Sequence, residues 1–140
     1  MNNKEHVLTY LETNRLMALA SSHNNKPWAV TVFFAYDTEL NLYFYSKPDT
    51  EHCKQIDSNN QVAVAIHQNW GEPGLIKGVQ LTGICTKPTG EEYTTSFNVY
   101  SRCHNWAHTY PDHVIYKIKP VVLYYLDHKL FGHFNRVRVV

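Results

Sequence analysis

The stretch that decides the fold is Trp28-Ala29-Val30-Thr31-Val32-Phe33-Phe34-Ala35-Tyr36. Its even-numbered positions carry bulky apolar side chains, and its odd-numbered positions form a smaller set. Successive side chains of a strand point to opposite faces, so the stretch predicts a strand with two unequal faces. On the smaller face a flat ligand or a second subunit can approach the backbone closely. The alternative is a plain barrel strand, with one face in the core and the other under a helix.

Other short β-type segments surround this strand. Turn formers at 22–27 and 37–39 connect it to its neighbours, and residues 70–74 form a further predicted loop. We expect strands at 16–20, 28–36, 42–45, 62–66, 76–85, 114–118, 121–125 and 134–139, and helices at 4–14, 50–57 and 91–108. Hairpin-length connections and the lack of long crossover helices favour an antiparallel sheet curled into a small barrel, with helices at its ends.

Composition narrows the class of protein. The 140 residues are 44% hydrophobic, which suits one domain spanning residues 1–140. A net charge of +1 provides no field for nucleic acid or an anionic membrane surface, and no apolar run is long enough to span a bilayer. The three cysteines, Cys53, Cys85 and Cys103, form no C-x-x-C pair. A reducing, cytoplasmic location is therefore expected, with the cysteines acting as small hydrophobes.

The segment Ser46–Lys54 is a candidate anion site. It places hydroxyls, Lys47 and His52 around a predicted strand-to-helix turn, with Asp49 or Thr50 as the helix N-cap. The free N–H groups and partial positive charge of a helix N-terminus favour a phosphate. Protonation of His52 near pH 6.5 would add a cation. The alternative is an ordinary capped surface helix, because no glycine-rich cradle is present.

Nine histidines raise the question of a metal. His104 and His108 have the i, i+4 spacing of metal ligands, but no H-E-x-x-H pattern and no third ligand accompany them, so no metal site is predicted. His133 follows Gly132 near the C-terminus and is a candidate haem ligand; the alternative is an exposed polar side chain.

A series of motifs resembles the pyridoxamine 5'-phosphate oxidase-like FMN-binding split barrels. The matching segments are 27–37, 42–46, 50–56 and 59–64, and their order and spacing match from about Leu16 to Gly83. Residues 76–83 and 126–132 are similar to a small, poorly characterised bacterial branch of that family.

The resemblance implies a six-stranded antiparallel split β-barrel and a homodimer with FMN at the subunit interface. Carried over by position, the strand from Ala29 to Phe34 faces the flavin, partly through backbone atoms. The residues implied to bind the cofactor are Ala29, Val30, Thr31, Val32, Tyr45, Ser46, Lys47, Thr50, His52, Gly78 and Gln80. The family usually has Arg or Lys at the positions of Glu51 and His52, so Lys47 and Lys54 are expected to compensate.

Two functions follow from the resemblance. The first is an FMN-dependent oxidoreductase acting on a small molecule, in which the flavin does the chemistry and no obligatory catalytic side chain stands out. The second is a non-enzymatic protein that holds flavin or haem. The segment Phe131-Gly132-His133-Phe134 is faintly similar to the glycine-rich C-terminal stretch of haem-utilisation proteins with this fold.

Overall fold

The computed structural model describes residues 1–68 and 71–140. Trp70, the first residue of the predicted loop 70–74, lies outside this described part. The elements, in chain order, are α1 (Asn3–Leu11), β1 (Leu16–His23), β2 (Lys26–Tyr36), β3 (Leu42–Ser46), α2 (Glu51–Ser58), β4 (Gln61–His67), β5 (Lys77–Thr86), α3 (Gly90–Cys103), the 3-10 helix η1 (Asn105–Thr109), β6 (Val114–Asp127), α4 (His128–Phe131) and β7 (Arg136–Arg138).

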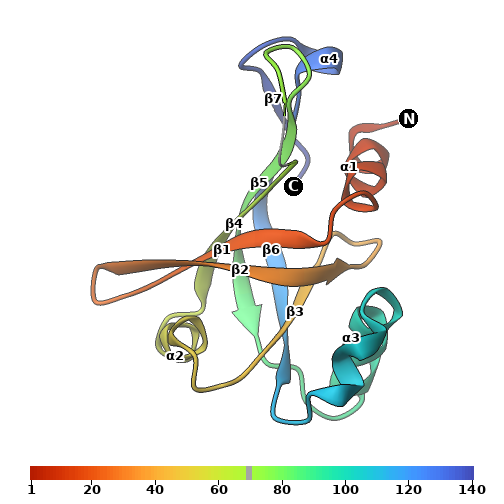
Figure 1. Cartoon of the computed structure of the whole chain (residues 1–140). Coiled ribbons are helices and arrows are strands. Elements are labelled where there is room, and N and C mark those ends of the chain that lie inside the picture. Colours follow the sequence, from red (N-terminus) through yellow and green to blue (C-terminus); the bar gives the residue numbers. More distant parts are fainter. Residues whose placement is uncertain (69–70) are drawn as a thin grey trace.

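The strands form one antiparallel sheet that closes on itself (Figure 1). Their order is β3-β2-β1-β4-β5-β6-β7, and β3 also pairs with β6, from Leu42 opposite Ile118 to Ser46 opposite Val114. Six strands therefore make a barrel, with β7 outside it. This confirms the predicted six-stranded antiparallel split barrel. Helix α4 and β7 lie at the end of the molecule away from α2 and α3 (Figure 1).

The alternation along β2 is the one that the sequence predicts. Phe34 is fully buried in the main core, and Val30, Val32 and Tyr36 pack against that core. Full burial of one such apolar side chain contributes about 1.5–3 kcal/mol. On the opposite face Ala29, Thr31 and Phe33 are exposed. The alternative of a face covered by a helix therefore holds only at the end of the strand, where Ala35 is buried under α3, and the rest of this face is open.

The β1–β2 hairpin reaches beyond the barrel (Figure 1). Its turn is only Asn24-Asn25, and both residues have positive φ, 50° and 61°, as a tight two-residue hairpin turn requires. The strands therefore extend into the predicted loop 22–27. Trp28, which the sequence places on the bulky face, is 48% exposed because it lies near this turn.

A second, smaller core lies between the sheet and α3. Ala35, Tyr43 and Ile115 from the sheet meet Tyr100 of α3 and Ala107 of η1. Phe97 and Trp106 pack against this cluster and are partly buried. The outer side of β3 is therefore covered by aromatic side chains from α3 and η1.

Two predicted strands at 114–118 and 121–125 are one strand, β6. Pro120 interrupts the pattern in the sequence, but the β5–β6 register shifts between Thr82 and Gly83, opposite this proline. A proline without an N–H fits such an irregularity. Gly83 is needed there, because a Cβ would lie 2.6 Å from the Lys119 carbonyl oxygen.

The predicted helix at 91–108 and strand at 134–139 are both too long. His104 leaves the helical conformation (φ −132°, ψ 76°), and its Nε2 is 2.8 Å from the Phe34 carbonyl oxygen, so α3 ends and η1 begins after it. Phe134 has a φ of 63° and is 90% exposed. Strand β7 therefore begins only at Arg136.

Candidate functional site

The side chains of strand β3 alternate between two hydrophobic clusters. Leu42 and Phe44 belong to the barrel core, whereas Tyr43 and Tyr45 pack with the cluster under α3. Ser46 is in phase with Phe44 and is buried. Neighbouring residues of the predicted site, Tyr45 and Ser46, are therefore on opposite sides of the strand.

A hydrogen-bonded cluster of Ser46, Thr50 and His52 joins β3 to α2. His52 Nε2 is 2.9 Å from Ser46 Oγ and 3.4 Å from Thr50 Oγ1. The His52 side chain is buried, and burial lowers its pKa below the ordinary value of 6.5. His52 is therefore a neutral hydrogen-bonding partner near pH 7, and its protonation moves to lower pH than the sequence indicates.

The N-terminus of α2 keeps free donors. Thr50 is the N-cap residue, but its hydroxyl donates to the Lys47 carbonyl oxygen at 2.8 Å, and no side chain in the described part of the chain caps this helix. The first-turn N–H groups, which have no partners within the helix, are thus not covered by a cap. Glu51 is the acidic residue of this turn.

An aromatic pocket lies on the outer side of β2 and β3. It has a volume of about 210 Å³ and is lined by Thr31, Val32, Phe33, Tyr45, Tyr100, Trp106, Tyr110 and His113. Three of these residues, Thr31, Val32 and Tyr45, are predicted cofactor-binding residues. Burial raises the pKa values of Tyr45 and Tyr100, so both remain protonated phenols at neutral pH.

The charged groups at this pocket are paired. His113 Nδ1 is 2.7 Å from Asp112 Oδ1, and this hydrogen bond is the main reason that the pKa of Asp112 is lowered. Lys47 Nζ lies 3.7 Å from Asp112 Oδ2. Lys47 therefore stands between the start of α2 and the aromatic pocket, with its side chain about half exposed.

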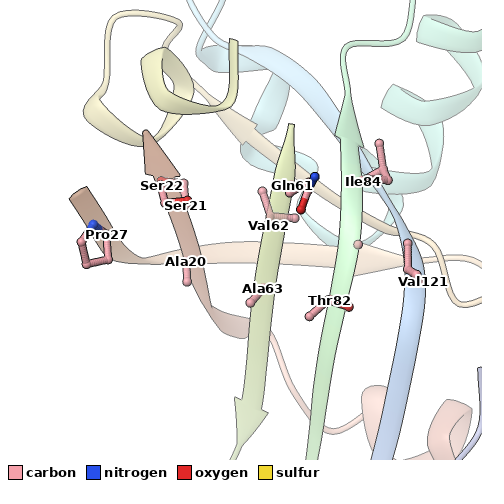
Figure 2. Close-up of a pocket in the computed structure, with 11 residues that line it drawn as sticks. Ala20, Ser21, Ser22, Pro27, Gln61, Val62, Ala63, Thr82, Ile84 and Val121 are labelled. Atoms are coloured by element: carbon pink, nitrogen blue, oxygen red, sulfur yellow. The ribbon is translucent and has the colours of Figure 1, made fainter. Parts of the chain in front are cut away.

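Small side chains make up part of the outer face of the sheet, on β1 and β4. Ala18 and Ala20 of β1 pair with Ala65 and Ala63 of β4. A groove of about 480 Å³ opens on this face (Figure 2). Its lining residues are Ala20, Ser21, Ser22, Pro27, Gln61, Val62, Ala63, Thr82, Gly83, Ile84 and Val121. Ala29 is opposite Ala20, at the border of this groove.

Gly78 and Gln80 lie apart from the other predicted residues. Both are on β5, which β1 and β4 separate from β2 in the sheet. Gly78 is buried, and a Cβ there would lie 3.1 Å from the Ile66 carbonyl oxygen. Gln80 Oε1 accepts a hydrogen bond from Arg136 at 2.9 Å. One chain therefore does not bring these two residues to the aromatic pocket.

The structure thus divides the predicted residues into three groups. Thr31, Val32 and Tyr45 share the pocket; Ser46, Lys47, Thr50 and His52 surround the start of α2; and Gly78 and Gln80 lie farther along the sheet. Val30 is directed to the core. Sequence reasoning missed the contributions of Tyr110 and His113 to the pocket. The sequence signal for Tyr110 is the density of aromatic residues between 97 and 110, a stretch that does not include His113.

The described residues contain no group of three or more His, Cys, Asp or Glu side chains arranged to hold a metal ion. Likewise, none of the helices in residues 1–68 and 71–140 has the length and apolar character needed to cross a membrane.

Comparison with known proteins agrees with this fold. A UPF0306 protein of Pasteurella multocida is 32% identical over 78 residues, which cover 55% of this chain and 52% of that protein. The chain thus spans about half the length of this relative. A haem-binding protein from Mycobacterium smegmatis superposes with a TM-score of 0.84 at 16% identity, over 100% of this chain and 58% of the other. A FAD-binding protein from Mesorhizobium loti superposes with a TM-score of 0.72 at 19% identity, over 87% of this chain and 90% of the other.

The family model described as pyridoxamine 5'-phosphate oxidase matches residues 4–127. The chain belongs to this family.

Proposed function

We propose that this chain is a cytoplasmic FMN-binding flavoprotein, an oxidoreductase that acts on a small molecule and works as a homodimer. In this proposal residues 1–140 form a single FMN-binding domain. The observation that carries it is the uncapped start of α2 beside Lys47, next to a pocket built on the predicted flavin-facing strand. Family membership supports the same choice.

The residues at the start of α2 fit a phosphate. The first-turn N–H groups are free of a side-chain cap, and Lys47 contributes a half-exposed ammonium group. The Thr50 hydroxyl stabilises the turn by donating a hydrogen bond to the Lys47 carbonyl oxygen. His52 forms a hydrogen bond with Ser46 at the end of β3. Glu51 opposes an anion, so we expect weaker binding than a site with two free cations would give.

The flat part of the cofactor fits the outer face of β2. Ala29 and Thr31 are small and exposed there, and Thr31 and Val32 reach the aromatic pocket. Bound FMN supplies hydride and electron transfer. The chain's own residues orient the ring, and the aromatic side chains of Phe33 and Trp106 restrict the access of water from one side.

A second subunit fits the exposed sheet face. Ala18, Ala29 and Ala65 project little from the backbone, and the groove of Figure 2 adds a hollow beside them. In a dimer formed through this face, Gly78 and Gln80 of one subunit would approach the β2 strand of its partner. This arrangement would bring Gly78 and Gln80 close to the other predicted cofactor-binding residues, from which they are separated within one chain.

An FMN titration tests the proposal. We expect saturable quenching of flavin fluorescence by the purified chain and a yellow complex. Lys47→Gln should weaken FMN binding about tenfold, because it removes the cation at the start of α2. Lys87→Gln is the matched control, because Lys87 has similar exposure and pairs with Asp57 at 3.0 Å. Equal loss in both variants, or no FMN binding by the native chain, would contradict the proposal.

A second candidate, haem binding without catalysis, has one observation in its favour. The rings of His128 and His133 are stacked, with centroids 5.2 Å apart, beside the highly exposed Phe134. Neutral imidazole is a haem ligand, and an exposed aromatic ring can cover a flat macrocycle. Haem added to the chain should then give a Soret band that His133→Ala removes, and this spectrum distinguishes the two candidates.

A further inference from the structure

The size of the aromatic pocket fits one ring. Its volume is about 210 Å³, and an apolar cavity of about 150 Å³ is enough to hold benzene. A single six-membered ring with a small substituent fills this space, whereas a three-ring flavin is too large to enter it entirely.

The walls of the pocket are aromatic rings set at steep angles to one another. Trp106 and Tyr110 are 5.7 Å apart between centroids at 88°, and Phe33 and Trp106 are 5.3 Å apart at 67°. A planar guest can therefore stack on one wall while its edge meets another, which are the two preferred geometries of aromatic pairs. The negative faces of these rings also attract a cation.

The charges around the pocket disfavour an anion. Among the described residues that line it, none is Lys or Arg. Lys47, which lies beside the pocket, forms an ion pair with Asp112. The Asp112 carboxylate also forms a hydrogen bond with His113. An anionic guest would meet π-faces that repel it, whereas a cationic guest would be attracted by them. The Asp112 carboxylate, bonded to the lining residue His113, adds negative charge next to the pocket.

We infer that the aromatic pocket is the substrate site and that it takes a single planar aromatic ring that is uncharged or cationic. The term substrate rests on the proposed function, while ring binding needs no flavin. Phe33 belongs both to this pocket and to the sheet face assigned to the partner subunit, so the site opens at the edge of the dimer interface.

Three ring compounds of one shape test the inference. N-methylnicotinamide, nicotinamide and nicotinate, which are cationic, neutral and anionic, are titrated into the ¹⁵N-labelled chain without FMN. The indole N–H resonance of Trp106, assigned with Trp106→Phe, reports binding. We expect the cation to bind at least as tightly as the neutral ring and about tenfold more tightly than the anion.

Tyr110 supplies the matched variants, because its side chain is 47% exposed. Tyr110→Leu should weaken binding of the cationic ring about threefold to tenfold, whereas Tyr110→Phe keeps the wall and should stay within about twofold. The thermal midpoints of both variants show that they are folded. Equal affinities of Tyr110→Leu and Tyr110→Phe would overturn the assignment.

Two further outcomes separate the proposals. If none of the three rings shifts Trp106 while FMN still binds, or if nicotinate binds as tightly as the cation, the inference is wrong and the proposed function stands. If the rings bind in the expected order and FMN does not bind, the proposed function is wrong and the ring pocket remains.

Discussion

His52 and Ser46 form a buried side-chain pair, with 2.9 Å between His52 Nε2 and Ser46 Oγ. The pair connects the first turn of α2 to the end of β3, and α2 in turn packs against β1. The histidine that the sequence offers as a phosphate ligand therefore also ties together the part of the chain that forms the proposed phosphate site.

Stability should depend on pH through this pair. Burial lowers the pKa of His52 in the folded chain, so the unfolded chain, with a pKa near 6.5, takes up the proton first on acidification. The free energy of unfolding should thus fall as pH drops below about 6.5, by at most about 1.4 kcal/mol per pH unit for one proton. His104 acts in the same direction, because burial also lowers its pKa.

Urea unfolding at pH 7.5, 6.0 and 5.0 measures this dependence. His52→Gln keeps a polar side chain beside Ser46 but cannot titrate, so its stability should fall less steeply with acid than that of the native chain. Identical slopes for the two proteins would exclude His52 as the titrating group.

The hydroxyl of Tyr116 should be dispensable. Among the described residues it makes no well-formed hydrogen bond although it is buried, and its neighbour is the Cys53 thiol, a weak hydrogen-bonding group. The Tyr116 ring stacks on Phe44 with centroids 4.8 Å apart. Tyr116→Phe removes an unsatisfied polar group and keeps the stack, so the free energy of unfolding should rise by about 1 kcal/mol.

Tyr125→Phe is the control, because the Tyr125 hydroxyl donates to Asp127 Oδ2 at 3.0 Å. This variant should lose about 1 kcal/mol. If the Tyr116 hydroxyl is unpartnered, chemical denaturation should show that the free energy of unfolding rises in Tyr116→Phe and falls in Tyr125→Phe. A loss of similar size in both would reveal a partner for Tyr116.

Thr50→Ala should weaken FMN binding about fivefold. The variant loses the hydrogen bond that the Thr50 hydroxyl donates to the Lys47 carbonyl oxygen and that holds the turn, worth about 1 kcal/mol. Thr50→Ser retains the hydroxyl and should bind within about twofold of the native chain. Fluorescence titration compares the three proteins, and unchanged affinity in Thr50→Ala would place the phosphate elsewhere.

The dimer should depend on the small residues of the sheet face. Ala18 is exposed and lies between Thr31 of β2 and Ala65 of β4. Ala18→Glu would bury a carboxylate in the proposed interface and should turn the dimer into a monomer. Thr95→Glu, on the exposed side of α3, is the control. Sedimentation at micromolar concentration reports the state; a native monomer would refute the proposed assembly.

Much of the fold could be predicted because its signals are local. The alternation along residues 28–36 and the hairpin-length connections are properties of neighbouring residues, and they predict the barrel correctly. The continuity of β6 through Pro120 could not be predicted in this way. It depends on Gly83 and the register of β5, which lie more than thirty residues away in sequence.

The same distinction applies to the candidate site. Ser46, Thr50 and His52 lie within seven consecutive residues, so the sequence predicts that they meet. The aromatic pocket joins Phe33 and Tyr45 to Trp106 and Tyr110, and only the placement of α3 and η1 brings them together. The burial of His52 could not be predicted from the sequence either, because it depends on how α2 packs on the barrel.

The pairing of β3 with β6 also affects solubility. It closes the barrel, so that in the described part of the chain outer strand edges remain on β7 and on residues 26–33 of β2, which pair with β1 alone. An exposed edge is a template on which other chains can add strands and aggregate. The β7 edge is only three residues long and has an arginine at each end, Arg136 and Arg138. Short length and like charge make β7 a poor template, so we expect edge-to-edge association of the folded chain to involve the β1–β2 hairpin instead.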